Sequence, residues 1–286
     1  MAQSETPISQ KVPDSLSQVV TTIKFNFLDY IRSRRFFILL LILAIISVIL
    51  TTVVAYYRPQ SILTGPLYFF SSWWGMSANF IVILSGIFFG GDAISGEFQN
   101  KTGYFSVPNP IRRSSIYVGK WLSAFIASSF ILGIFTAVTL ANEMYYFGIG
   151  WPPTEFVESF LFTWFYLVGV LGFTFMFSSL FKSSSYSILV TAILFLFGFT
   201  LIETLLTDLA KVEPWFIITY GGEIIGSVLN PAGYPAHIQT ITSPFGRGES
   251  FTTYTATIPE GLIIIAIYFI ATAVLGLWLF ERKEFN

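Results

Sequence analysis

Long apolar segments alternate with short polar intervals along the whole chain, and six of these segments carry almost no charge. Each is long enough to cross about 30 Å of hydrocarbon as an α-helix that rises about 1.5 Å per residue. They run approximately over residues 36–56, 66–91, 117–141, 156–181, 184–206 and 261–280. The pattern predicts an all-α integral membrane protein whose domain of residues 36–286 contains six transmembrane helices, called spans one to six below.

A weaker amphipathic pattern precedes the first span and follows a polar tail of residues 1–14. In residues 15–35, Ser15 and Gln18 have the spacing of a capping box, and basic residues at the end would meet lipid headgroups. We expect an amphipathic interfacial helix on the cytoplasmic membrane surface, although a cytoplasmic helix packed on a partner would give the same pattern. Its apolar stripe at helical period consists of Leu16, Val19, Val20, Ile23, Phe27, Tyr30 and Ile31.

The interval between spans five and six, residues 207–260, is much longer than the others and rich in Gly, Pro, Thr and Tyr. Its apolar stretches 215–220 and 224–229 are too short to cross a membrane, and Gly221 and Gly222 lie between them. These features favour a re-entrant or interfacial helical hairpin on the outer side. A small irregular outer cap is the alternative.

The basic residues set the orientation, because short cytoplasmic loops retain Lys and Arg. An even number of spans places both termini on one side. With cytoplasmic termini, three basic residues lie outside, namely Arg58, Lys211 and Arg247, and the other twelve lie inside. We therefore expect a multi-pass protein of the cell membrane with its N- and C-termini in the cytoplasm. The inner set is Lys11, Lys24, Arg32, Arg34, Arg35, Lys101, Arg112, Arg113, Lys120, Lys182, Arg282 and Lys283.

Composition agrees with lipid as the solvent: 54% of the residues are hydrophobic, 11% are charged, and the mean hydropathy is +0.70. A net charge of −1 gives no indication of nucleic-acid binding. The chain has no Cys, so it contains neither a disulfide nor a thiolate metal site. The same composition is compatible with a hot or acidic habitat.

Residues for catalysis or for an internal energy source are not visible. The sole Gly-Lys pair, Gly119–Lys120, is followed by Trp121 and lacks the glycine-rich pattern of a phosphate-binding loop. The single histidine, His237, is interpreted as a loop histidine, and we expect no catalytic residue, no metal site and no cofactor in this chain. The span centres carry no ionisable group, which disfavours an ion-driven carrier. Carboxylates near the outer ends of spans are interpreted as solvated at the interface; they are Glu143, Glu158, Glu203 and Glu260.

Span two carries one face of small and polar residues: Ser72, Gly75, Asn79, Gly86 and Gly90. At about 100° per residue these five positions lie close together around the helix, and Gly86 and Gly90 form a small-xxx-small pair. Tight packing within one subunit explains such a face. The alternative is a face that meets a second subunit and lines a translocation path, with Asn79 near the membrane midplane.

The interval after span two, residues 92–113, is polar, aromatic and, in this topology, cytoplasmic. Residues 94–99 predict a short helix, and Asn109–Pro110 predicts the start of another helix that continues into span three. Exposed aromatic residues beside charges are suited to docking a soluble partner. A lipid-facing linker is the alternative.

This interval resembles the cytoplasmic loop of the permease subunits of type 2 ABC exporters, and the chain is similar to archaeal-like members. The resemblance rests on Glu97, Thr102, Pro110, Arg112 or Arg113, and then Gly119–Lys120, in that order. A turn at residues 178–184 and a basic end at residues 281–284 extend it along the chain. Where the family often has Gly-Thr, this chain has Lys101–Thr102, which alters the coupling segment in detail.

The resemblance implies half of a transporter, with the alternatives of a membrane scaffold or assembly factor and of an ion-coupled carrier. Its partners would be a second copy or a homologous permease, the lipid bilayer, and a separate nucleotide-binding subunit that holds ATP and Mg and hydrolyses the ATP. A substrate of unknown identity would pass between the halves near spans two and five. The coupling residues implied are Glu97, Phe98, Thr102, Tyr104 and Pro110, fixed by Arg112 and Arg113.

Overall fold

The computed structural model describes residues 14–101, 112–242 and 250–283. Within them, six helices are long and apolar enough to cross a membrane. The prediction of an all-α integral membrane protein with six spans is confirmed. The helices extend beyond the apolar segments at most ends; they are Arg34–Tyr57, Pro66–Gln99, Arg113–Phe147, Thr154–Leu180, Ser184–Ala210 and Ile258–Arg282.

The labelled elements divide two of the spans. Spans one, three, four and six are α2 (Arg34–Tyr57), α8 (Arg113–Phe147), α9 (Thr154–Leu180) and α14 (Ile258–Arg282). Span two comprises α4 (Pro66–Phe70), the π-helix η1 (Ser71–Gly75), α5 (Met76–Gly90) and, after a turn, α6 (Ser95–Gln99). Span five comprises α10 (Ser184–Ile193), η2 (Leu194–Gly198), α11 (Phe199–Thr204) and η3 (Leu205–Ala210), with η2 and η3 again π-helical.

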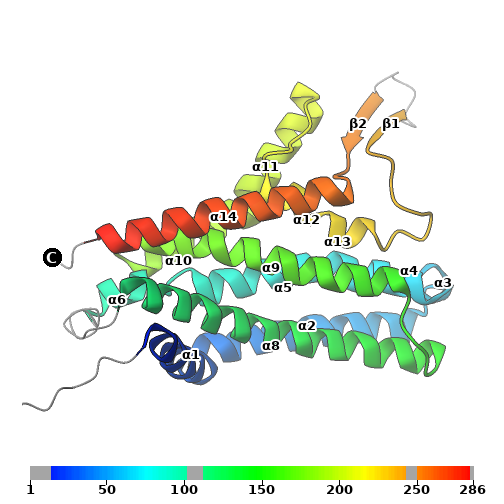
Figure 1. Ribbon diagram of the computed structural model, residues 1–286. Coiled ribbons are helices and arrows are strands. Elements are labelled where there is room, and N and C mark those ends of the chain that lie inside the picture. Colours follow the sequence, from blue (N-terminus) through cyan, green and yellow to red (C-terminus); the bar gives the residue numbers. More distant parts are fainter. Residues whose placement is uncertain (1–13, 102–111, 243–249, 284–286) are drawn as a thin grey trace, which may run out of the picture.

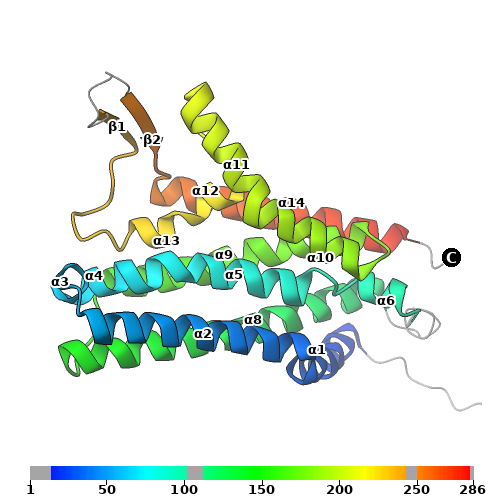
Figure 2. The same cartoon turned by 180° about the vertical axis from the view of Figure 1, so that it is seen from behind.

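The spans run side by side, with α5 and α9 in the middle, α2 and α8 on one side, and α14 with α10 on the other (Figures 1 and 2). One end of the bundle holds α1 (Ser15–Arg32), α6 and the last turn of α14, and we call it the basic end. The opposite end holds α3 (Gln60–Leu63) and a two-stranded hairpin, and we call it the hairpin end. The two chain ends that the structure describes therefore lie together, as an even number of spans requires.

The first helix, α1, lies across the axis of the bundle and packs on α8 (Figure 1). Its N-cap is Asp14, whose Oδ1 accepts a hydrogen bond from the Ser15 backbone N–H at 2.8 Å. The predicted capping box of Ser15 and Gln18 is wrong, because Gln18 is buried and its Oε1 accepts from the Arg112 backbone N–H at 3.3 Å. Leu16 and Val20 stay exposed, which leaves apolar surface for lipid.

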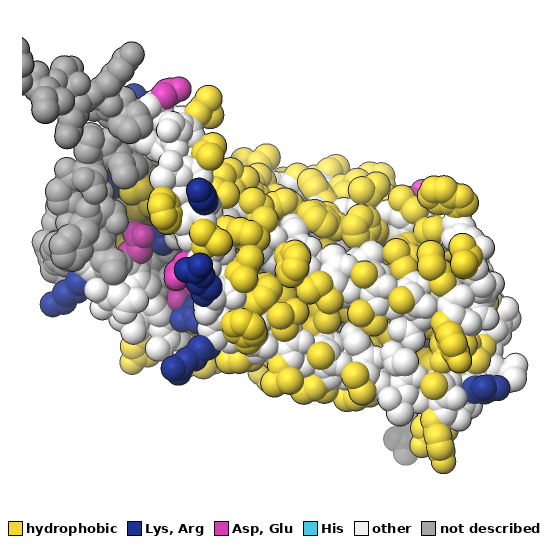
Figure 3. All heavy atoms as spheres, turned by 90° about the horizontal axis from the view of Figure 1, so that it is seen from below, with side chains coloured by type: hydrophobic (Ala, Val, Ile, Leu, Met, Phe, Trp, Pro, Cys, Tyr) yellow, Lys and Arg dark blue, Asp and Glu magenta, His cyan; other side chains and the backbone are white. Residues whose placement is uncertain are grey.

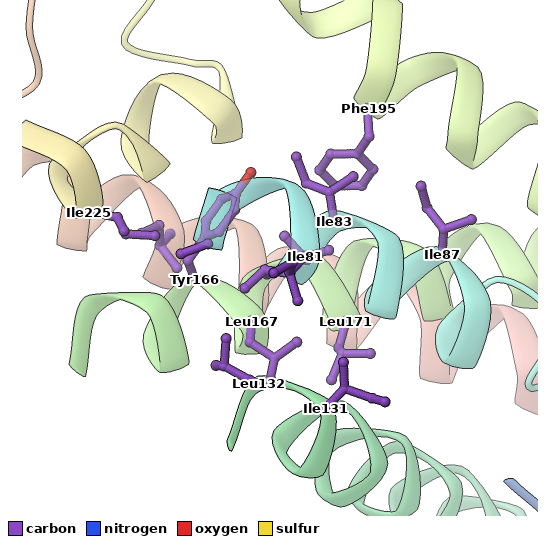
Figure 4. Packing of buried hydrophobic residues seen from close by; sticks show 14 of the residues in the cluster. Ile81, Ile83, Ile87, Ile131, Leu132, Tyr166, Leu167, Leu171, Phe195 and Ile225 are labelled. Carbon is purple, nitrogen blue, oxygen red and sulfur yellow. The ribbon is translucent and has the colours of Figure 1, made fainter. Parts of the chain in front are cut away.

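Contact between α5 and α9 forms the centre of the core, and glycine makes it close. A Cβ atom at Gly86 would lie 2.5 Å from the Val170 side chain, and one at Gly90 would overlap Thr174. Around this contact, Ile83 of α5 and Phe195 of η2 face each other, and Leu167 and Leu171 of α9 point toward α8 (Figure 4). Close backbone approach through small residues is how helices pack in lipid, where burial gives no hydrophobic driving force.

The described residues between spans five and six, 211–242 and 250–257, begin with a part that packs on the bundle. The short helices α12 (Ile218–Gly222) and α13 (Ile224–Ser227) follow one another with only Glu223 between them, and both are largely buried against α9, α14 and span two. Glu223 has helical backbone angles, so the chain continues through Gly221 and Gly222 and does not turn back there as the expected helical hairpin requires. Strands β1 (Ile238–Thr242) and β2 (Ser250–Tyr254) then pair antiparallel, with Ile238 opposite Tyr254. No hydrophobic pattern in the sequence predicts these strands.

The outer surface of the bundle is apolar along its length. Figure 3 shows the face of α2 and α8 covered with hydrophobic side chains, and Lys and Arg gathered at the basic end. Span five is the least covered helix: in an apolar window of 18 residues, 11% are buried, against 61% in span two. Its second half, α11, leans away from the bundle in both ribbon views (Figures 1 and 2).

Candidate functional site

At the basic end, an ion pair joins α6 to α8. Lys120 Nζ lies 2.8 Å from Glu97 Oε1 and donates a second hydrogen bond to the Ala93 carbonyl oxygen, also at 2.8 Å. Lys120 is buried, and the Glu97 side chain is 15% exposed. Removing one partner from such a pair leaves an uncompensated charge in a poorly hydrated place. The acidic residue and the Gly-Lys pair, which are separate in the sequence motif, are thus in direct contact.

Further hydrogen bonds hold α6 on two other spans. The Ser178 hydroxyl of α9 accepts from the backbone N–H groups of Ile94 and Ser95, at 2.9 and 3.0 Å. Gln99 Oε1 accepts from the Ser184 backbone N–H at the start of α10, at 2.7 Å. These bonds satisfy donors that a short helix leaves unpaired in its first turn. Together with the ion pair to Lys120, these bonds join α6 to spans three, four and five.

The turn before α6 is also fixed, and so is Phe98 within α6. In the turn before it, Asp92 forms an ion pair with Arg35 of α2. Lys283, just after α14, lies 4.3 Å from the Phe98 ring centre and donates to the carbonyl oxygens of Ser179 and Phe181 at 2.9 and 2.7 Å. Burial, and then the nearby Lys182, lowers the pKa of Lys283 to about 8. The C-terminal end of span six thus belongs to the same cluster.

The predicted coupling residues have different positions in the structure. Glu97 faces Lys120, and Phe98 packs edge-on against Phe280 of α14 with ring centres 6.5 Å apart. Arg112 is the exposed N-cap of α8, and Arg113 donates to the Glu281 and Lys283 carbonyl oxygens at 2.7 and 3.0 Å. Thr102, Tyr104, Asn109 and Pro110 lie outside the described residues. The outermost described residues after Phe98 are Gln99, Asn100 and Lys101, all exposed.

At the hairpin end, a cavity of about 560 Å³ lies between spans two, four and five, α12 and β2. Asn79 of α5 donates to the Gly222 carbonyl oxygen at 3.3 Å, while its Oδ1 has no hydrogen-bond partner among the described residues. Hydroxyl groups dominate the rest of the polar wall. The lining residues are Asn79, Ile83, Tyr166, Phe195, Thr200, Glu203, Thr204, Thr207, Thr219, Glu223, Thr253, Tyr254 and Thr255.

Two carboxyl groups face each other in this cavity. Glu203 of α11 accepts a hydrogen bond from the Thr219 hydroxyl at 3.2 Å and shares another with Glu223, which lies between α12 and α13. Burial, followed by the charge of Glu203, raises the pKa of Glu223 to about 8. A second negative charge beside Glu203 is costly, so the uncharged form of Glu223 is favoured. The interpretation of Glu203 as an ordinary solvated carboxylate is therefore wrong.

Sequence reasoning missed Glu223, since nothing in the order of residues places it beside Glu203. The packing of α12 against α11 brings them together. Two of the π-helices also border this cavity, with Phe195 in η2 and Thr207 in η3. Single π-turns widen a helix locally and occur often at functional sites. No hydropathy pattern signals them.

The small and polar face of span two is largely occupied within the protomer. Gly86 and Gly90 contact α9, and a Cβ at Gly75 would lie 3.4 Å from the Gly226 Cα of α13. Ser72 is half-buried in η1. Asn79 is the residue of this face that lines the cavity. That Asn79 lines a translocation path therefore stays a prediction.

Together, these features define a class: a multi-pass membrane protein with six spans, an N-terminal helix packed on span three, a short helix bonded to the spans at one end and a polar cavity at the other. The chain belongs to the ABC-2 family of transporter proteins, whose family model matches residues 21–285. No curated protein matches the sequence. It is a membrane permease subunit of an ABC transporter, a generally non-catalytic component that associates with an ABC ATPase subunit in a membrane.

Proposed function

We propose that the protein is half of an ATP-driven exporter and that α6 transmits the movement of a cytoplasmic ATPase subunit to the spans. The buried pair of Lys120 and Glu97 carries this proposal. A lever must be rigidly joined to what it moves, and α6 is bonded to α8, α9 and α10 while its last residues are exposed. Glu97 then fixes α6 to α8 from the buried side, and the partner contacts the exposed residues that follow Glu97.

The basic end is cytoplasmic in this proposal. Twelve of the basic residues belong to that side of the topology and three to the other. ATP, Mg and ATP hydrolysis belong to the partner subunit. The membrane is the cell membrane, and both termini lie in the cytoplasm.

A second copy or a homologous permease completes the transporter through span five. This span has the smallest buried fraction of the six, and its exposed side chains include Tyr186, Phe197 and Leu201. The polar cavity lies directly behind it. Pairing along span five would cover the cavity and enclose the outer part of a path between the halves.

The cargo we expect is amphipathic, with hydrogen-bond donors or a positive charge on its polar part. Glu203, Glu223 and the orphan Asn79 Oδ1 are acceptors, and Ile83 and Phe195 supply apolar contact in the same cavity. Fold alone does not select a cargo, so this expectation rests on the lining.

Purification of the chain from its native membrane in mild detergent tests the proposal. We expect a stoichiometric ATP-binding subunit to co-purify, and ATP hydrolysis to fall or lose its dependence on cargo in Glu97→Gln. Glu158→Gln, an exposed carboxylate at the other end of the bundle, is the matched control. A chain isolated without any ATPase would contradict the exporter and favour a scaffold or assembly factor.

Reconstituted vesicles then test the path. Asn79→Leu should reduce cargo flux while the complex still hydrolyses ATP. Flux that proceeds without ATP and follows a proton gradient would instead identify an ion-coupled carrier, in which Glu203 and Glu223 would carry the proton.

A further inference from the structure

Three metal-ligating side chains meet at the hairpin end, outside the polar cavity. Glu213 comes from the segment between η3 and α12, His237 from the residues just before β1, and Glu260 from the first turn of α14. His237 Nε2 lies 3.4 Å from Glu213 Oε2, His237 Nδ1 lies 3.8 Å from Glu260 Oε2, and the three ligand atoms lie within 4.8 Å of one another. All three residues are half-buried.

The orientation of the imidazole ring indicates what belongs between these groups. His237 Nδ1 lies 2.9 Å from the Thr255 carbonyl oxygen, which can only accept a hydrogen bond, so Nδ1 carries the hydrogen. In the neutral ring, the Nε2 lone pair then faces the Glu213 carboxylate. Two acceptors that face each other need either a proton or a cation between them. A metal-binding histidine characteristically donates its other N–H to a carbonyl or carboxylate.

The separation of the acceptors fits a metal ion. Ligands bound tetrahedrally at about 2.0–2.2 Å from zinc are roughly 3.3–3.6 Å apart. The distance from His237 Nε2 to Glu213 Oε2 falls within this range. An ion could thus occupy the site without rearrangement of these two ligands.

Each carboxylate also accepts a hydrogen bond from outside the cluster. The Tyr220 hydroxyl donates to Glu213 Oε1 at 2.7 Å, which leaves Oε2 turned toward His237. The Thr257 backbone N–H donates to Glu260 Oε2 at 3.2 Å, as part of the capping box of α14. Outer contacts of this kind fix ligand orientation in metal sites.

We propose that Glu213, His237 and Glu260 bind one divalent transition-metal ion, with zinc as the best chemical fit. One imidazole and two carboxylates favour zinc and its neighbours over magnesium or calcium, which prefer all-oxygen sites. Three protein ligands leave a fourth position for water. The ion joins the segment before α12, the β-hairpin and span six, so it pins the outer elements to the bundle. The interpretation of His237 as a loop histidine was based on the absence of ligands nearby in sequence, and the fold supplies them.

Metal titration of the purified full chain in detergent, after removal of metal with a chelator, tests the site. We expect one equivalent of Zn²⁺ to bind by calorimetry, and Co²⁺ to give the visible absorption of a tetrahedral or five-coordinate complex. His237→Gln, Glu213→Gln and Glu260→Gln should each weaken binding by at least about tenfold. Glu158→Gln, a carboxylate outside the cluster, should leave it unchanged.

The competing arrangement is an imidazolium held between two carboxylates without metal. Zinc binding that is absent, or equal in His237→Gln and the parent chain, would overturn the metal site. Equal losses of thermal stability for His237→Gln in chelator and in zinc would also overturn it, since a metal link is lost only when metal is present. The measurement uses the isolated chain without ATPase or cargo, so its failure leaves the permease function standing.

Discussion

The two ends of the molecule use ionisable residues in opposite ways. At the basic end, charges of opposite sign are paired, as in Lys120 with Glu97 and Arg35 with Asp92. At the hairpin end, Glu203 faces Glu223, and Glu213 lies near Glu260, so carboxyl groups confront one another. Paired charges are internally satisfied and hold a structure rigid. Facing carboxyl groups need a proton, a metal ion or a cationic ligand, so the hairpin end is the end suited to binding.

Breaking the buried pair at the basic end should have the largest effect. Lys120→Met removes the partner of Glu97 and the donor to the Ala93 carbonyl, which should destabilise the chain by about 3–5 kcal/mol. Thermal unfolding in detergent measures the loss. The double variant Lys120→Met with Glu97→Met leaves no unpaired charge and should recover much of it. A double variant as unstable as the single one would show that the pair is not what holds α6.

The second effect, at the hairpin end, depends on pH. In the folded chain the pKa of Glu223 is about 8, whereas the ordinary pKa of a glutamate side chain is 4.5. Between these two pH values the folded state therefore binds more protons than the unfolded state. The contribution of protonated Glu223 to the free energy of unfolding is fully present below about pH 4.5 and is lost as the pH rises through about 8. Melting temperatures measured across this window should fall with rising pH, and less steeply in Glu223→Gln. Glu158→Gln should follow the parent curve, and a flat parent curve would contradict the raised pKa of Glu223.

A smaller effect tests the packing between the two ends. Gly90→Ala places a methyl group against Thr174 and Phe175 and should destabilise by about 1–3 kcal/mol through overpacking. The matched control is Gly133→Ala, since no described atom lies within 4 Å of the added Cβ there. The control should be neutral or slightly stabilising, because alanine favours helix. Equal melting temperatures for the two variants would mean that α5 and α9 are not in close contact.

The same comparison explains what could be predicted from the sequence. The six spans were predictable because twenty consecutive apolar residues have few alternatives to a transmembrane helix. The region of Glu97 was recognisable because its residues lie close together in one loop. The pairs Glu203 with Glu223 and Glu213 with His237 were not, because each joins segments whose approach depends on how α12, α13 and β2 fold back. The first residue of α1 could not be predicted either, because Asp14 and Ser15 are both good capping residues and lie one position apart.

The smallest expected effect concerns how firmly the outer hairpin is attached. The Tyr254 hydroxyl donates to the Lys211 carbonyl oxygen at 2.7 Å, at an exposed position where water can replace it. Tyr254→Phe should therefore cost only about 0.5–1 kcal/mol in global stability. Hydrogen exchange should increase locally in β1 and β2 while α6 stays protected, because local opening reflects local contacts. If the ion attaches the β1–β2 hairpin to the bundle through His237, added zinc should suppress this increase. Increased exchange that zinc does not affect would show that the metal site does not hold the hairpin in place. Faster exchange at both ends would show instead that the bundle couples the β1–β2 hairpin to α6.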